Sequence, residues 1–233
     1  MYYVNSFIII ITLTILMIQN RIYDKNKNKI ILNYMINNKK LCSIIYFLIK
    51  NSNNLGKTKL MKLIYLADYE FFKLYNKKIS NLDYIRWDFG PFSPDIYDCL
   101  DCMADIGIIA MQKFKSFYKL RDYFSFRTKQ EFNFNENLES NEIDFFKHIL
   151  SKYDAMEIDD IKKITYKTEP MIEAKNKGDL LKFENIDKSI SVKIKKLGKK
   201  VQTLKNYKGK PLDPEDSLGG DDLIEYQYDL ITE

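Results

Sequence analysis

The sequence has 233 residues, of which 45% are apolar and 14% aromatic, and its formal net charge is +5. This length favours one good-sized domain with appendages, and the apolar content is enough for a core, which excludes a wholly disordered chain. Three cysteines and one histidine exclude a disulfide framework and most metal-centred chemistry, and they suit a reducing, cytoplasmic protein.

The first 34 residues form an apolar N-terminal extension. Residues 7–18 are uncharged and nearly all apolar, and with the residues just before them they approach the lower limit for a membrane-spanning helix. Basic residues follow this run but do not precede it, so a real membrane anchor would keep the rest of the chain in the cytoplasm. The alternative is a mis-assigned start, because Met35 opens a clean domain start. Both interpretations place the working domain after residue 34.

Helical periodicity predicts two helices at the start of this domain. Apolar residues from Leu41 to Ile49 recur at helical spacing, which indicates a helix over 38–50. We expect Thr58 to cap a longer helix that runs to about Asn76. Its apolar residues extend beyond one face, which indicates that this helix packs on more than one side and is central.

Strand signals interrupt the helical pattern twice. Residues 83–88 are β-prone and lead into a turn at 89–94 that is rich in glycine and proline. A helix is expected over 94–105, because Ser93 and Pro94 favour its start and Gly107 its end. Aromatic residues at alternating positions in 108–115 and 118–128 then predict a β-hairpin.

Three further helices are expected, at 141–152, at 158–164 and from about Pro170. Residues 35–183 are therefore predicted to form an α+β, predominantly α-helical fold, which is a compact helical domain with a short strand and a β-hairpin.

Residues 184–233 form a charged C-terminal tail. Its basic half, 188–210, has nine lysines and no acidic residue, and its acidic half, 211–233, has eight acidic residues and no Lys or Arg, so the two nearly cancel (+9 − 8 = +1). Residues 189–195 alternate like an edge strand or like a segment that becomes one on a partner. The basic half is either a solvated face or a phosphate-binding segment. The acidic half could fold back on it or enter a basic groove of a partner.

The residue types that catalysis needs are not grouped in this sequence. Cys99 and Cys102 form a CxxC pair, but no second Cys or His pair follows to complete a zinc site. The lone His148 has no Cys or Ser partner in sequence, and Asn51 stands where a P-loop ending at Thr58 would need its first glycine. We therefore expect a protein that is not an enzyme and that uses no metal or cofactor.

Three segments carry recognisable motifs: residues 59–68 (KLMKLIYLAD), residues 84–97 (YIRWDFGPFSPDIY) and residues 161–171 (IKKITYKTEPM). Together they resemble the Panacea antitoxin domain family, also called SocA-like. The first is similar to the family's KLxKLlYfaD helix and the second to its xxwxyGPvxxxly segment. The third stands where the family has a short helix and a Ser-His…Pro-Trp-like stretch, with Tyr166 where His is common and Met171 where an aromatic residue is common.

The resemblance implies a function in a type II toxin–antitoxin system. In such a system this protein would bind and block a cognate protein toxin, encoded by a neighbouring gene. The family is also known from phage-associated proteins, which implies a connection with phage defence. Its toxins belong to diverse chemical classes, so the sequence does not name this one.

The second motif concentrates residue types that are enriched at protein interfaces. These candidates for partner binding are Arg86, Trp87, Phe89, Gly90, Pro91, Phe92 and Tyr97. A proline-stiffened turn also loses little entropy when it docks. The alternative is that Gly90 and Pro91 only form the turn while the aromatic residues cover the core, with Trp87 as a core anchor if it is buried. Phe89 and Phe92 are the better candidates for an exposed surface.

Two residues of the long helix complete the candidate set. Tyr65 and Asp68 are three residues apart and therefore lie on one side of that helix. Asp68 is expected either to form a buried pair with Arg86, which would hold the helix to the turn, or to contact the toxin.

The alternative function is a DNA-binding transcriptional regulator, acting on operator DNA as an autorepressor of its own operon. Two helices followed by a β-hairpin are compatible with a winged helix-turn-helix. Lys57, Lys59 and Lys62 at the start of the long helix would then face the DNA. A membrane partner is expected only if residues 1–34 are a real anchor.

Overall fold

The computed structural model describes residues 27, 29–53, 55–115, 122–133 and 136–187. Residues 29–37 are helical, and they are followed by α2 (Lys39–Asn51), α3 (Lys57–Tyr75), β1 (Ile85–Trp87), β2 (Gly90–Phe92), α4 (Pro94–Asp105), β3 (Ile109–Lys115), β4 (Asp122–Thr128), α5 (Ser140–Tyr153), α6 (Ile158–Tyr166) and α7 (Glu169–Glu173). β1 pairs with β2 and β3 with β4, both antiparallel. The fold is α+β and predominantly helical, as predicted.

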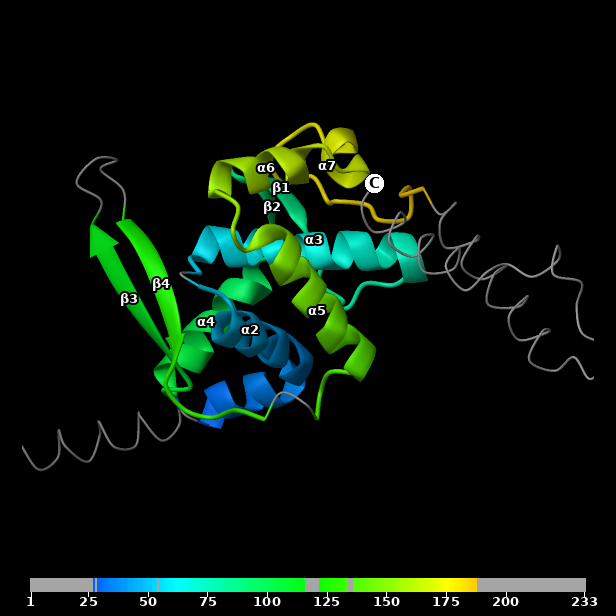
Figure 1. Cartoon of the computed structure of the whole chain (residues 1–233). Coiled ribbons are helices and arrows are strands. Elements are labelled where there is room, and N and C mark those ends of the chain that lie inside the picture. The colour runs from blue at the N-terminus through cyan, green and yellow to red at the C-terminus, as the bar shows by residue number, and fades with distance from the viewer. Residues whose placement is uncertain (1–26, 28, 54, 116–121, 134–135, 188–233) are drawn as a thin grey trace, which may run out of the picture.

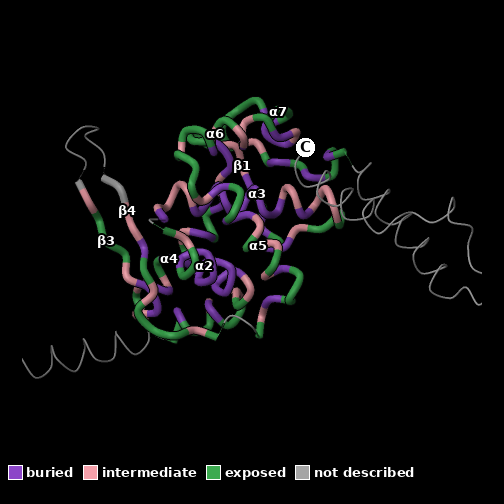
Figure 2. The backbone as a smooth tube through the Cα atoms, viewed as in Figure 1, coloured by how far each residue is buried: buried purple, intermediate pink, exposed green. Residues whose placement is uncertain are grey.

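α3 is the central helix of the domain (Figure 1). Residues 60–68 of α3 and 41–49 of α2 are buried without interruption, so neither helix has an exposed face over these stretches, and Figure 2 shows both mainly as buried. A helix buried all round must be covered from several sides. α5 and α6 pack against α3, together with β2, which confirms the central position predicted for this helix.

The ends of α3 show why it spans these residues. The prediction that Thr58 caps the helix is wrong, because α3 begins at Lys57 with Gly56 as its N-cap and no side-chain cap. A Cβ at position 56 would lie 3.0 Å from the carbonyl oxygen of Phe124 in β4, so the close approach of β4 requires glycine. At the other end Asn76 takes the left-handed conformation (φ 56°) and terminates the helix.

The folded unit extends beyond the predicted N-terminal boundary. The helix over 29–37 crosses it, and Ile31 and Met35 are both only 6% exposed in the common core. The hydroxyl of Tyr34 donates to the carbonyl oxygen of Asp95 at 3.3 Å. Removal of residues 29–34 would therefore take away core contacts.

Several sequence predictions fall outside the described residues. These are the apolar run at 7–18, the edge strand at 189–195 and both halves of the charged tail. Among the helices that the structure does describe, none has the length and apolar character needed to cross a membrane.

Residues 84–94 form a hairpin, where the sequence predicted one strand and a turn. The chain reverses at Asp88 and Phe89, and the residues from Gly90 to Phe92 return as β2. Gly90, directly after this two-residue turn, has φ +97°. Glycine adopts such a positive φ without steric cost, so it suits this position of the hairpin. Pro91 lies in an edge strand, where its missing N–H is tolerated.

A later segment adds a further strand-like pairing to β1. The backbone N–H of Arg86 donates to the Asp179 carbonyl oxygen, and the Gly178 N–H donates to the Arg86 carbonyl oxygen, both at 2.8 Å. Ile85 and Leu180 form an antiparallel bridge. β1 is therefore held on both sides, by β2 and by the chain that follows α7.

Candidate functional site

The three motif segments, which are far apart in the sequence, meet beneath the β1–β2 hairpin. Lys62 of α3 donates from Nζ to the Pro91 carbonyl oxygen at 2.6 Å. The Tyr65 hydroxyl lies 2.6 Å from Thr168 Oγ1, just before α7. Arg86 Nη1 donates to the carbonyl oxygen of Met171 at 2.8 Å. Hydrogen bonds therefore connect the three motif segments to one another in a small polar cluster.

Lys62 is a buried cation at the centre of this cluster. Its side chain is almost fully buried (residue exposure 2%), and the described residues place no carboxylate within ion-pairing distance of it. Burial lowers the pKa of Lys62 to about 7, and the nearby positive charge of Lys162 acts in the same direction. Gly90 makes room for it, because a Cβ there would lie 3.3 Å from Lys62 Nζ and 3.4 Å from Thr165 Oγ1.

The predicted ion pair between Asp68 and Arg86 is wrong. Asp68 instead holds the loop after α3: its Oδ1 accepts from the backbone N–H groups of Ile79 and Ser80, both at 2.8 Å. Its Oδ2 accepts from the hydroxyls of Ser80 and Tyr84, the latter at 2.7 Å. Burial raises the pKa of Asp68, and these hydrogen bonds oppose that shift.

Arg86 is used elsewhere, on the C-terminal motif. Besides Met171 it donates to the Ala174 carbonyl oxygen at 3.1 Å, and its guanidinium lies 5.4 Å from the ring centre of Tyr166. Tyr166 stands where the resemblance led us to expect a histidine, and its ring lies within cation–π distance of the Arg86 guanidinium.

Tyr65 and Asp68 are core residues, with 0% and 1% exposure. Tyr65 packs edge-on against Tyr84 and Phe183, with ring centres 5.2 and 5.8 Å away. Neither side chain is accessible to a partner in this conformation, so we exclude both from the candidate interface and assign them to its support.

The accessible part of the site is the tip of the hairpin. Trp87 is 41% exposed and Phe89 48% exposed, so Trp87 does not have the burial that a core anchor would need. Lys177 Nζ lies 4.1 Å from the Trp87 ring centre and pairs with Asp88 at 2.7 Å. Lys162 Nζ lies 5.4 Å from the ring centre of Phe89. The tip therefore presents aromatic rings flanked by lysines.

The remaining candidates lie behind the tip. Gly90 and Pro91 are buried. Phe92, which the sequence placed on the surface, is half-buried between Trp87 and Tyr97, with ring centres 5.9 and 5.3 Å away. Tyr97 is half-buried as well. These rings pack behind Trp87 and limit its movement.

The lysines at the start of α3 do not form a DNA-facing helix. Lys62 is buried, and Lys59 donates to the Asp154 carbonyl oxygen with only 14% of its side chain exposed. Lys57 lies against the Tyr97 and Phe124 rings. The α3 helix is therefore covered where a recognition helix would have to be free, and the winged-helix interpretation is wrong for this helix.

The cysteines do not assemble a metal centre in the part of the chain that is described, where no group of three or more His, Cys, Asp or Glu side chains could hold an ion. Cys99 and Cys102 lie on α4, and the sulfur of Cys99 faces that of Cys42 on α2 at 2.9 Å. The hydrogen bond with Cys42, together with burial, raises the pKa of Cys99, and burial raises the pKa of Cys102. Both shifts disfavour the thiolate form that binds metals.

Comparison with known proteins agrees with the motif resemblance. Residues 60–170 match the family model described as antitoxin SocA-like, Panacea domain, and the match covers all three motif segments apart from Lys59 and Met171. No curated protein and no solved structure matches the chain.

Proposed function

We propose that this chain, which belongs to the SocA-like Panacea family through residues 60–170, is the antitoxin of a type II system. It binds a cognate protein toxin directly and blocks it, without catalysis. We place its action in the cytoplasm, because three cysteines without a disulfide framework suit a reducing compartment.

The observation that carries the proposal is the exposed aromatic tip on a rigid support. Trp87 and Phe89 are large apolar side chains that remain 41% and 48% exposed, although the two strands behind them, apart from Trp87 itself, are buried or half-buried. Exposed rings of this kind are the residues that dominate binding energy at protein interfaces, often by about 2 kcal/mol or more each.

The support under the tip lowers the entropic cost of binding. β1 is paired on both sides, and Lys62 and Arg86 tie the hairpin to α3 and to the chain after α6. A surface that is already ordered in the free protein loses little conformational freedom when a partner docks.

Growth rescue tests the proposal. The neighbouring open reading frame is expressed under tight control, alone and with the full chain, because residues 29–34 contribute to the core. We expect the product of the neighbouring gene to stop growth when it is expressed alone, to be harmless when it is co-expressed with this chain, and to co-purify with it.

A matched pair of variants tests the tip. Phe89→Ala removes an exposed ring at the tip, and Tyr75→Ala removes a ring of similar exposure (47% against 48%) at the far end of α3. We expect Phe89→Ala to weaken toxin binding by roughly tenfold or more and Tyr75→Ala to leave it unchanged. If the product of the neighbouring gene is harmless when expressed alone, or still toxic when co-expressed with this chain, the antitoxin function is contradicted. Equal effects of the two variants contradict the interface.

A further inference from the structure

One face of the small sheet around β1 carries apolar side chains from three segments of the chain. Ile85 of β1 stands opposite Phe92 of β2 and, on its other side, opposite Leu180. Side chains that stand opposite one another in neighbouring strands lie on the same face of a sheet. Trp87 follows Ile85 by two residues, so its side chain lies on that face as well. Ile85, Trp87, Phe92 and Leu180 therefore form one apolar surface, which we call the outer sheet face.

The opposite face of this sheet packs on the domain. The hydroxyl of Tyr84, just before β1, donates to Asp68 of α3 at 2.7 Å. Arg86 donates to the carbonyl oxygen of Met171 in α7 at 2.8 Å. Tyr84 and Arg86 alternate with the residues of the outer sheet face along the chain. The outer sheet face is therefore turned away from α3 and α7.

Much of the outer sheet face is open to solvent. Leu180 is 54% exposed and Trp87 41% exposed, while Ile85 and Phe92 are half-buried. Single apolar side chains are common on protein surfaces, but neighbouring ones that form a patch mark interaction sites. Trp87 belongs both to this face and to the tip of the hairpin, so the outer sheet face continues the surface that we propose for the toxin.

Helix α4 adds an acidic border to the outer sheet face. Tyr97 of this helix packs edge-on against Phe92, with ring centres 5.3 Å apart. The helix contains four aspartates and no lysine or arginine. Asp98 and Asp101 are exposed and lie one turn apart on the same side of α4. Lys57 lies 3.8 Å from Asp101, whereas the described residues place no basic side chain within ion-pairing distance of Asp98.

We propose that the toxin covers the outer sheet face in addition to the tip, with an apolar strip that is bordered by basic residues. This inference rests on the proposed antitoxin function and names the chemistry of the partner. The apolar strip would bury Trp87 and Leu180, and its lysine or arginine side chains would lie beside Asp98. Opposite charges at the rim of an interface accelerate association and orient the two proteins, while burial of apolar side chains at its centre supplies affinity.

Substitution of Leu180 tests the apolar part of this surface. Surface plasmon resonance measures binding of the product of the neighbouring gene to the full chain, to Leu180→Asp and to the control Ile172→Asp. Ile172 has almost the same exposure (53% against 54%) but lies on α7, on the side of Arg86. A carboxylate buried without a partner is costly, so we expect Leu180→Asp to bind about tenfold or more weakly and Ile172→Asp to stay within about twofold of the full chain. Circular dichroism checks that each variant is folded.

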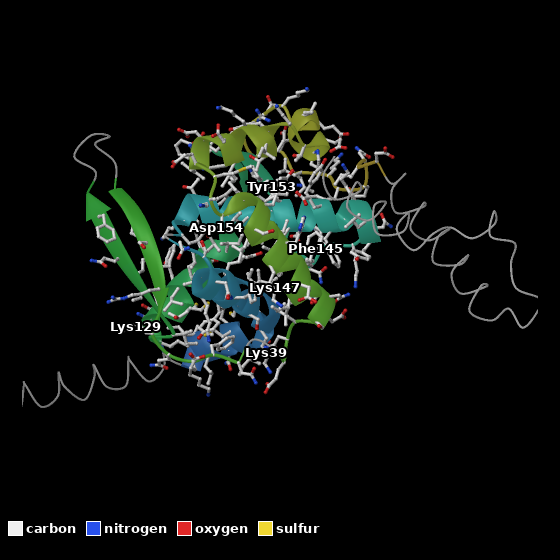
Figure 3. All side chains as sticks on the ribbon, in the orientation of Figure 1. Lys39, Lys129, Phe145, Lys147, Tyr153 and Asp154 are labelled. Atoms are coloured by element: carbon white, nitrogen blue, oxygen red, sulfur yellow. The ribbon has the colours of Figure 1, made fainter. Side chains whose placement is uncertain are left out.

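Charge reversal tests the acidic border. Asp98→Lys is compared with Asp144→Lys, which makes the same change on α5. Figure 3 labels Lys147 on that helix, the residue with which Asp144 pairs at 2.8 Å. We expect Asp98→Lys to slow association about fivefold or more at about 50 mM salt, with a smaller difference at about 200 mM. The control should stay within about twofold of the full chain at both salt concentrations.

The outcomes separate this inference from the antitoxin function. If the unsubstituted chain does not bind the product of the neighbouring gene, both are contradicted. If it binds, but Leu180→Asp binds as tightly as Ile172→Asp, the antitoxin function stands and the toxin does not cover the outer sheet face. Faster association of Asp98→Lys would contradict a basic border on the toxin. A dimer of the free chain in gel filtration that Leu180→Asp dissociates would assign this face to a second copy and overturn the proposal.

Discussion

Replacement of Lys62 by methionine is expected to stabilise the protein at and below neutral pH and to destabilise it at high pH. Burial lowers the pKa of Lys62 from 10.5 to about 7, a change of 3.5 (10.5 − 7). At 1.36 kcal/mol for each pKa unit, this corresponds to about 5 kcal/mol of unfavourable free energy for the buried ammonium.

The sign follows from which state holds the proton. Below pH 7 Lys62 is protonated in both the folded and the unfolded state, so the folded state is destabilised by the whole free-energy cost of the buried ammonium. Between pH 7 and 10.5 the unfolded chain keeps the proton and the folded chain does not, so the free energy of unfolding rises with pH. Methionine removes this slope. It also leaves the Pro91 carbonyl oxygen without the hydrogen bond from Lys62, which costs about 1–3 kcal/mol.

The difference between the two proteins therefore changes sign with pH. At pH 6 Lys62→Met should be more stable by about 2–4 kcal/mol, and near pH 10 it should be less stable by up to about 2 kcal/mol. Urea unfolding from pH 6 to 10, followed by circular dichroism, measures this difference, and every other titrating group cancels in it. A difference that does not vary with pH, or a variant that is less stable at pH 6, would refute the reasoning.

Three further substitutions probe the support of the tip. Asp68→Ala should lower the free energy of unfolding in urea by about 3 kcal/mol, because four buried donors lose their acceptor. Asp68→Asn should lower it clearly less, since asparagine keeps an acceptor for the two backbone N–H groups. Similar losses in the two variants would contradict this account. Gly90→Ala should lower the stability by about 1–3 kcal/mol, because φ is +97° and its Cβ would crowd Lys62; an unchanged melting temperature would contradict it. Ser93→Ala should raise the stability by about 1 kcal/mol, because the described structure gives the buried Ser93 hydroxyl no partner; calorimetry that shows a loss would disprove that reading.

Local patterns in the sequence were enough to predict most of the elements. Apolar spacing placed α2, α5 and α6 to within a residue or two, and alternating aromatic residues placed the β3–β4 hairpin. Gly107, with φ +77°, follows α4 as predicted. These features depend on residues that are neighbours along the chain, so the printed sequence contains the whole signal. The motif resemblance likewise pointed to the family whose model matches residues 60–170, because it needs only residue order.

The candidate site depended on contacts between distant residues. The sequence offered two partners for Asp68, which were Arg86 and the toxin. The tertiary structure instead gives Asp68 the donors of its own loop and Arg86 the carbonyl oxygens after α6. Lys62 looked like a DNA contact because lysine is usually exposed, yet the packing of β2 and α6 on α3 buries it. The sequence thus determined which residue types were available. Packing decided that Trp87 is exposed and that Lys62 is buried, because solvent access depends on every element that covers a side chain.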